Sequence, residues 1–248
     1  MTHFSDEQDI LLELLAQKLP ELNTQILDYV RHEGQELPIY GFTIGSKVPD
    51  RFTVCLVGGV HGLERIGTHV VFAFLNKVVR ELSWDTLWAE LLKKIRIVSV
   101  PVVNPVGVLN GSRSNGRGVD LMRNAPLDAE VSVTPLVGGH RISRNLPWYR
   151  GDNIKNKKAG METESRALVE FVEQEVFPAP GSIILDVHSG FGFKDRLWYP
   201  FAGLKDRFPY ENQIRTITNI LNQTLPHHVY TVEPQEKIYR THGDLWDY

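Results

Sequence analysis

Residues 52–64, FTVCLVGGVHGLE, decide the fold of this chain. The first six residues are apolar or β-branched without alternation, which is typical of a strand that a sheet buries on both faces. Two glycines end this strand, and a helical pattern follows over about residues 64–82. The stretch therefore reads as strand, turn and helix, the unit from which α/β proteins are built.

Strands and helices alternate along the rest of the chain. The pattern predicts strands over 37–44, 95–102, 182–187 and 228–232, helices over 6–19, 21–33, 84–94, 161–176 and 212–225, and a loop over 126–160. This order indicates an α/β fold with a mixed, mainly parallel central sheet and helices on both faces. No repeat or linker divides the chain, so we expect a single domain over residues 1–248.

Composition excludes several classes of protein. Lys and Arg total 27 and Asp and Glu total 30, so the chain lacks the basic excess of proteins that bind nucleic acid or anionic membranes. The single cysteine, Cys55, can form neither an internal disulfide nor a cysteine zinc cluster. No apolar run approaches the roughly 20 residues that span a bilayer, and the first residues do not resemble a signal peptide. We therefore expect a cytoplasmic protein.

Two common hydrolase and nucleotide-binding signatures are missing from the sequence. The chain contains no Gly-x-Ser-x-Gly nucleophile elbow, and no Gly-Lys-Ser/Thr follows its paired glycines. Cys55 lies inside an apolar strand, where an inert thiol is expected. Serine hydrolases, cysteine hydrolases and phosphate-loop proteins are therefore disfavoured.

Possible metal ligands follow two of the predicted strands. His61 and Glu64 come after the strand over 52–57, and His188 directly follows the strand over 182–187. The carboxyl ends of parallel strands meet at one edge of a sheet, so these side chains should converge. Two imidazoles and one carboxylate form a known ligand set for catalytic zinc. Each feature alone is common in proteins without metal, but their combination favours a metal site.

Three motifs carry a resemblance to a known family. They are GVHGLE at 59–64, RSNGRGVDLMRN at 113–124 and DVHSG at 186–190. In order and spacing they resemble the zinc carboxypeptidase (M14-like) family, which includes murein-peptide amidases and the aspartoacylase and succinylglutamate desuccinylase branch. The resemblance implies a carboxypeptidase-like sheet and one Zn²⁺ ion per chain, held by His61, Glu64 and His188. It also implies that Asp120 hydrogen-bonds the first zinc histidine.

The resemblance further implies two arginine roles. Arg113 matches the arginine that polarises the scissile carbonyl and stabilises the oxyanion, and a fixed guanidinium there lowers the barrier by a few kcal/mol. Arg123 matches the arginine that binds the terminal carboxylate of a substrate by a bidentate pair. A structural ion pair is the alternative for Arg123.

Two departures from the family pattern bear on activity. Met122 stands where the family usually has Asn, which removes one donor for a substrate carboxylate and leaves C-terminal specificity open. The family's general-base glutamate lies on a late strand, beyond a segment that resembles residues 242–248. We therefore expect the chain to be C-terminally incomplete, to lack its last strand or strands and its general base, and to show little turnover on its own.

These observations lead to one predicted function and two alternatives. The prediction is a metallocarboxypeptidase-like exopeptidase that hydrolyses an amide or peptide bond with zinc. One alternative is an aspartoacylase-type amidohydrolase that acts on an N-acyl amino acid. The other is a catalytically inactive domain that binds a metal or a peptide. The expected partner is a peptide or N-acyl amino acid substrate, with neither nucleic acid nor membrane.

Overall fold

The computed structural model describes residues 6–152, 160–190 and 193–248. The chain divides into two compact units that alternate along the sequence. Unit 1 comprises residues 1–117 and 162–189, and unit 2 comprises residues 118–161 and 190–248. Each unit is described separately, and the single catalytic domain that the sequence predicts stays a prediction.

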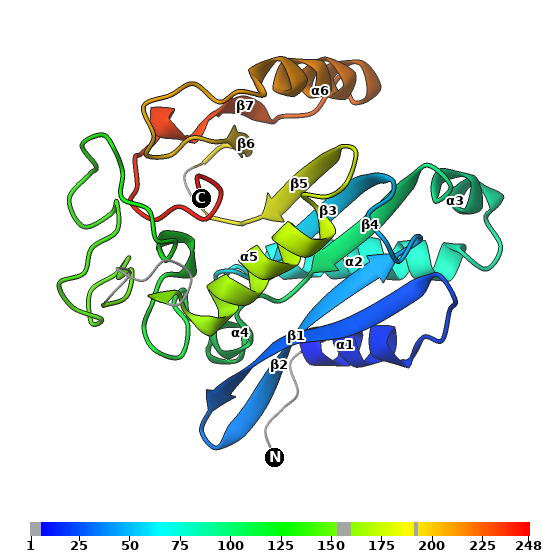
Figure 1. Cartoon of the computed structure of the whole chain (residues 1–248), viewed down its shortest axis with the longest axis horizontal. Coiled ribbons are helices and arrows are strands. Elements are labelled where there is room, and N and C mark those ends of the chain that lie inside the picture. Colours follow the sequence, from blue (N-terminus) through cyan, green and yellow to red (C-terminus); the bar gives the residue numbers. More distant parts are fainter. Residues whose placement is uncertain (1–5, 153–159, 191–192) are drawn as a thin grey trace. The chain divides into compact units, whose positions relative to one another are not determined.

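Unit 1 contains a five-stranded mixed sheet (Figure 1). In spatial order its strands are β1 (Leu22–His32), β2 (Gln35–Ile44), β4 (Ile95–Val100), β3 (Phe52–Gly58) and β5 (Ser182–Val187). The inner strand β3 runs parallel to both of its neighbours, β4 and β5. The pairs β1–β2 and β2–β4 are antiparallel. The predicted α/β fold with a mixed central sheet is therefore confirmed.

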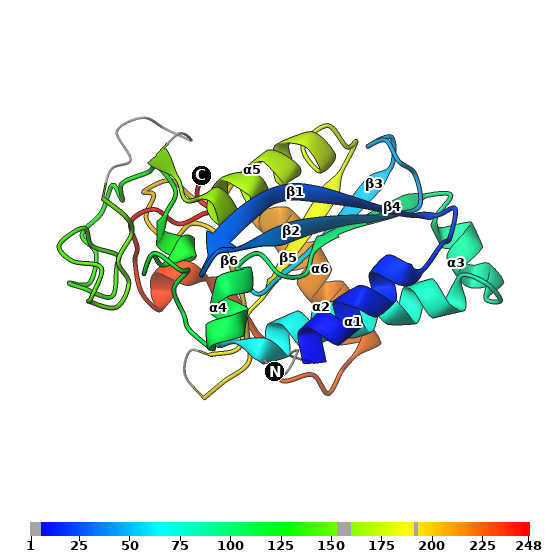
Figure 2. The ribbon, with the colours of Figure 1, turned by 90° about the horizontal axis from the view of Figure 1, so that it is seen from below.

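Helices cover both faces of this sheet (Figure 2). They are α1 (Asp6–Ala16), α2 (Arg65–Glu81), α3 (Thr86–Leu91), α4 (Pro105–Asn110) and α5 (Thr163–Glu175). On one face, Phe72 of α2 is fully buried and belongs to the same core as Phe42 of β2. On the other face, the ring of Phe171 of α5 lies against Gly41, the residue before Phe42. Successive strand residues point to opposite faces, so the two helices pack on opposite sides.

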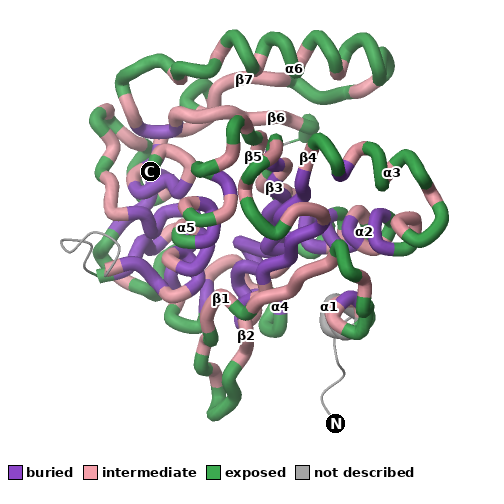
Figure 3. The backbone as a smooth tube through the Cα atoms, turned by 45° about the vertical axis from the view of Figure 1, so that its right-hand side comes forward, coloured by how far each residue is buried: buried purple, intermediate pink, exposed green. Residues whose placement is uncertain are grey.

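The core explains why the helices stay on the sheet. Buried residues gather on β2, β3 and β4 and on α2, whereas β1 and β5 carry none (Figure 3). The fully buried or nearly buried side chains of α2 include Val71, Phe72 and Leu75. Burying one such side chain stabilises a fold by about 1.5–3 kcal/mol. The helical spacing after residue 64 predicts an inward side with Val70, Val71, Phe74, Leu75 and Val78, and this is confirmed for Val71, Leu75 and Val78. It is wrong for Val70, which is exposed, while Phe72 is buried instead.

The helix predicted over residues 21–33 is wrong, because this segment is strand β1. It pairs with β2 over its whole length, from Leu22 opposite Ile44 to His32 opposite Gln35. Two residues connect the strands, Glu33 with φ 48° and Gly34 with φ 78°. Positive φ at both positions is the geometry of a tight hairpin turn, and glycine adopts it without steric cost. Pairing across this turn outweighs the weak helical preference of the segment.

Unit 2 contains less regular structure. Its strands β6 (Arg196–Tyr199) and β7 (Thr231–Pro234) form a parallel pair, and α6 (Glu211–Thr224) connects them. The described part of unit 2 also contains the 3-10 helices η1 (Leu121–Arg123) and η3 (Gln235–Lys237). The sequence pattern misses β6 and places β7 three residues too early. The described part of the predicted loop over 126–160 is irregular as expected, and residues 153–159 lie outside the described residues.

None of the helices in the described ranges combines the length and the apolar character needed to cross a bilayer.

Candidate metal centre

The ends of two neighbouring strands bring the predicted ligands of unit 1 together. Strands β3 and β5 run parallel, and Gly58 lies opposite Val187 in their register. The turn after β3 carries His61 and Glu64, while His188 directly follows β5. The rings of His61 and His188 have centroids 5.0 Å apart. The predicted convergence of these side chains is therefore present in the structure.

A close backbone approach makes this arrangement possible. Gly67 lies in the first turn of α2, three residues after Glu64. A Cβ atom at Gly67 would lie 2.1 Å from the carbonyl oxygen of Val187. No real Cβ contact is that short, so only glycine lets the start of α2 approach the end of β5 this closely. This approach holds Glu64 near His188.

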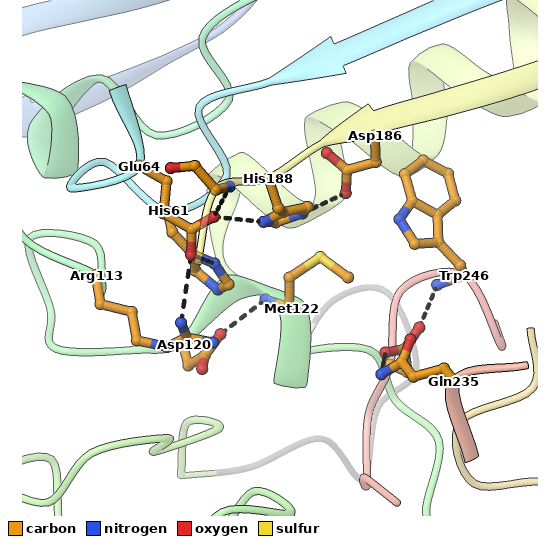
Figure 4. A network of polar contacts seen from close by, with 11 residues as sticks. His61, Glu64, Arg113, Asp120, Met122, Asp186, His188, Gln235 and Trp246 are labelled. Carbon is orange, nitrogen blue, oxygen red and sulfur yellow. Dashed lines mark hydrogen bonds and ion pairs between the residues drawn. The ribbon is translucent and has the colours of Figure 1, made fainter. Parts of the chain in front are cut away.

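The carboxylate of Glu64 lies between the two imidazoles (Figure 4). Its Oε1 is 2.9 Å from Nδ1 of His61, and its Oε2 is 3.1 Å from Nδ1 of His188. The ligand atoms of the three residues all lie within 4.8 Å of one another. Among the described residues, no other group of three or more His, Cys, Asp or Glu side chains converges in this way.

This ligand set fits a zinc ion. Zinc binds imidazole nitrogen and carboxylate oxygen at about 2.0–2.2 Å, so ligand atoms of a tetrahedral site lie roughly 3.3 Å apart. The separations of 2.9 and 3.1 Å between Glu64 and the two imidazoles are close to that value, and both histidines turn the same ring nitrogen, Nδ1, toward the shared carboxylate. Three protein ligands leave one position open, which is the pattern of a catalytic zinc site.

Buried charge dominates the electrostatics around Glu64, which is 6% exposed. Burial opposes its ionised form, but hydrogen bonds from His188 and His61 outweigh burial and hold the pKa of Glu64 below its usual range. The backbone N–H of Ser189 donates to Oε2 at 2.8 Å. Nη1 of Arg113 lies 3.5 Å from Oε1. The structure therefore brings Arg113 to the predicted ligands, as the sequence indicates.

Asp186 is a functional residue to which the sequence analysis assigns no role. Its Oδ2 lies 2.8 Å from Nε2 of His188, two residues further along the chain and just past the end of β5. Residues i and i+2 of a strand share one face, so the strand period was the signal that could have found this pair. Burial opposes the charged imidazole, but Asp186 and Glu64 outweigh burial and raise the pKa of His188. A carboxylate at Nε2 keeps the proton there and leaves Nδ1 free for a metal.

Replacing Asp186 with alanine should weaken zinc binding by about 10- to 100-fold, because outer partners of ligating histidines contribute that much to affinity. Titration against a competing chelator measures this change. The control is Asp50→Ala, which removes an exposed carboxylate of the same unit. Equal zinc affinity in the two variants would show that Asp186 does not orient His188.

The remaining predicted site residues, Asp120 and Arg123, belong to unit 2. The side chain of Asp120 caps η1 by accepting the N–H of Met122 at 3.1 Å (Figure 4). Arg123 is 2% exposed, and its guanidinium carbon lies 5.4 Å from the centroid of the Tyr239 ring. Burial opposes its charge, but Asp120, Tyr239 and Asp244 outweigh burial and raise the pKa of Arg123. The roles in histidine orientation and carboxylate binding, and the structural ion pair as the alternative for Arg123, stay predictions.

A buried carboxylate pair lies at the start of α5 in unit 1. Glu162 is 8% and Glu164 1% exposed, and Nδ2 of Asn115 donates to both carboxylates. Burial, together with the charge of Glu162, raises the pKa of Glu164 to about 7. No signal in the sequence indicates this pair, because Asn115 and the glutamates are almost 50 residues apart.

Glu164 should make the stability of the protein depend on pH. Its pKa is higher in the folded than in the unfolded chain, so the folded state binds more protons between about pH 4.5 and 7. The free energy of unfolding should therefore fall by up to about 3 kcal/mol across this window and level off above it. Glu164→Gln should remove most of this fall in thermal unfolding at pH 5 and pH 8. The exposed Glu170→Gln is the control, and an unchanged pH dependence in Glu164→Gln would contradict the assignment.

The chain is similar in sequence to zinc carboxypeptidases. The model of the family described as zinc carboxypeptidase matches residues 13–248. Carboxypeptidase E of Caenorhabditis elegans is 28% identical over 171 residues, which are 61% of this chain and 36% of that protein. Inactive metallocarboxypeptidase ecm14 of Talaromyces stipitatus is 25% identical over 187 residues, which are 70% of this chain and 30% of that protein. The chain thus spans about a third of the length of the curated relatives it matches.

Solved structures show the same fold. The crystal structure of carboxypeptidase A from Helicoverpa armigera matches with a TM-score of 0.70 and 17% sequence identity. The match covers 96% of this chain and 57% of that one. At this identity the likeness supports the fold alone.

Proposed function

Because the chain belongs to the zinc carboxypeptidase family, we propose that the protein is an exopeptidase that hydrolyses an amide or peptide bond with the help of one zinc ion. The convergence of His61, Glu64 and His188 on one point carries this proposal. The relative from Talaromyces stipitatus is named an inactive metallocarboxypeptidase, so membership of the family is separate from catalytic activity.

Residues of unit 1 would hold the metal ion and stabilise charge on the substrate. His61, Glu64 and His188 would hold the zinc ion, and Asp186 would orient His188 through Nε2. A bound zinc ion supplies Lewis-acid polarisation and lowers the pKa of a water molecule. The guanidinium of Arg113 would donate hydrogen bonds to the oxygen of the scissile carbonyl. Its fixed positive charge stabilises the negative charge that this oxygen gains in the transition state.

The substrate class is also a proposal. A peptide with a free terminal carboxylate fits the family, and an N-acyl amino acid is the alternative. Both carry a carboxylate, which Arg123 would bind. The formal net charge of -3 favours neither nucleic acid nor an anionic membrane as partner. A cytoplasmic location belongs to the same proposal.

A second candidate function is a domain that binds metal or peptide without catalysis. The relative from Talaromyces stipitatus, which is named an inactive metallocarboxypeptidase, favours this possibility. Such a domain would keep the zinc ligands and lose turnover.

Elemental analysis combined with a hydrolysis screen tests these candidates. In a form of the protein that includes the late strand with its general-base glutamate, which the kinetic tests below also use, we expect one zinc ion per chain and cleavage of peptides with a free C-terminal carboxylate, but not of the same peptides with an amidated C-terminus. Cleavage restricted to N-acyl amino acids would favour the aspartoacylase type. Stoichiometric zinc without any turnover would favour the binding domain, and protein without zinc affinity would refute both hydrolase functions.

A further inference from the structure

Arg113 lies in a loop, residues 112–117, that is held by hydrogen bonds on both sides of the arginine. On one side, the carbonyl of Ser112 accepts the backbone N–H of Leu63 at 3.0 Å. Leu63 precedes Glu64, so this bond joins the loop to the turn that carries two predicted zinc ligands. The hydroxyl of Ser112 also donates to the carbonyl of Ser114 at 2.8 Å, which stiffens the loop across Arg113.

On the other side, hydrogen bonds from the side chain of Asn115 connect the loop to the start of α5. Its Nδ2 donates to Oε2 of Glu162 at 3.0 Å and to Oε1 of Glu164 at 3.2 Å. Its Oδ1 accepts the backbone N–H of Arg117 at 3.0 Å. The amide therefore uses its donor and acceptor groups at once, and Asn115 itself is 6% exposed.

The charges around Asn115 make this side chain hard to replace. Two buried carboxylates face one amide group, and the guanidinium of Arg117, whose side chain is 77% exposed, lies 3.5 Å from Glu162. Alanine at Asn115 would leave both carboxylates without this donor, which is unfavourable for buried charge. Aspartate would add a third carboxylate. Only a neutral side chain with two donor hydrogens satisfies the pair.

The geometry leads to a role in catalysis through Arg113. We propose that Asn115, held between Glu162 and Glu164, is a positioning residue that keeps the guanidinium of Arg113 beside Glu64. The 3.5 Å separation of Arg113 Nη1 and Glu64 Oε1 is the contact that this loop maintains. The catalytic consequence rests on the proposed hydrolase function. A misplacement of a reacting group by about 1 Å can lower a rate by roughly 100-fold, so the hydrogen bonds that hold this loop should affect the rate of hydrolysis.

Kinetics of Asn115→Ala test the proposal. We expect kcat to fall roughly 10- to 100-fold with KM within about 3-fold, because Arg113 acts on charge that develops in the transition state. In the double variant with Arg113→Ala, Asn115→Ala should cause no further loss. The control is Ser99→Ala, which removes a buried hydrogen bond of the same unit, from Ser99 Oγ to the Leu56 carbonyl. Losses that multiply in the double variant would overturn the proposal.

A second pair of variants covers the case that Asn115→Ala does not fold. Glu164→Gln keeps an oxygen that accepts from Asn115, and Glu164→Ala removes it. We expect kcat within about 3-fold of the wild type for glutamine and a loss of roughly 10-fold or more for alanine. Equal kcat in both variants would contradict the positioning role.

A spectroscopic readout separates this proposal from the proposed function. The NMR signal of the Arg113 Nε–H group should shift and broaden in Asn115→Ala, but not in Ser99→Ala. If the wild-type protein hydrolyses no substrate, the proposed function fails while this signal still decides the positioning role. An unchanged Arg113 signal in Asn115→Ala would overturn the proposal whatever the activity.

Discussion

His61→Ala protein should contain no stoichiometric zinc and should lose at least about 1,000-fold in kcat/KM. The imidazole of His61 supplies one of three converging ligand atoms, and its Nδ1 lies 2.9 Å from Glu64. Two remaining protein ligands bind zinc far more weakly than three. The metal contributes several kcal/mol of transition-state stabilisation, and each 1.4 kcal/mol changes the rate about tenfold.

Elemental analysis after dialysis, followed by kinetics, measures both effects. His227→Ala is the matched control, because it removes an exposed imidazole of the same chain. The control should retain wild-type zinc content and activity. A His61→Ala protein that keeps one tightly bound zinc ion would show that the ligand assignment is wrong.

Arg113→Ala should separate catalysis from metal binding. Loss of one fixed donor to a developing oxyanion lowers kcat by about 100- to 1,000-fold. Zinc content should stay at one ion per chain, since Arg113 contacts Glu64 at 3.5 Å without being a possible ligand. KM should change little, because the charge that Arg113 stabilises appears in the transition state. Steady-state kinetics together with elemental analysis check this expectation.

The control for Arg113→Ala is Arg31→Ala, which removes an arginine side chain that is 84% exposed. Arg113→Lys should recover only part of the lost rate, because an ammonium group lacks the planar pair of donors. An Arg113→Ala protein with wild-type kcat would exclude the oxyanion role.

The ligand trio was predictable because its members follow β3 and β5, two neighbouring parallel strands of the sheet. An apolar run marks each strand, and parallel strands end at the same edge, so His61 and His188 could be placed together from the sequence. The spacing of Glu64 from His61 completed the trio. This part of the site depends on local pattern and on one rule of topology.

Other features depend on contacts between distant segments, which the sequence pattern does not reveal. The segment of β1 resembles a helix until its pairing with β2 is known. Asn115 meets Glu162 and Glu164 only because α5 packs against the sheet of unit 1. The strand period could have placed Asp186 and His188 on the same face, and the 2.8 Å contact between them shows that the carboxylate partners the imidazole.

The most direct test of the metal centre is anomalous X-ray diffraction at the zinc absorption edge from crystals grown with zinc. The account predicts one strong peak within about 2.0–2.2 Å of Nδ1 of His61, Nδ1 of His188 and an oxygen of Glu64. A zinc peak on other residues, or no peak between these three side chains at full zinc loading, would contradict it.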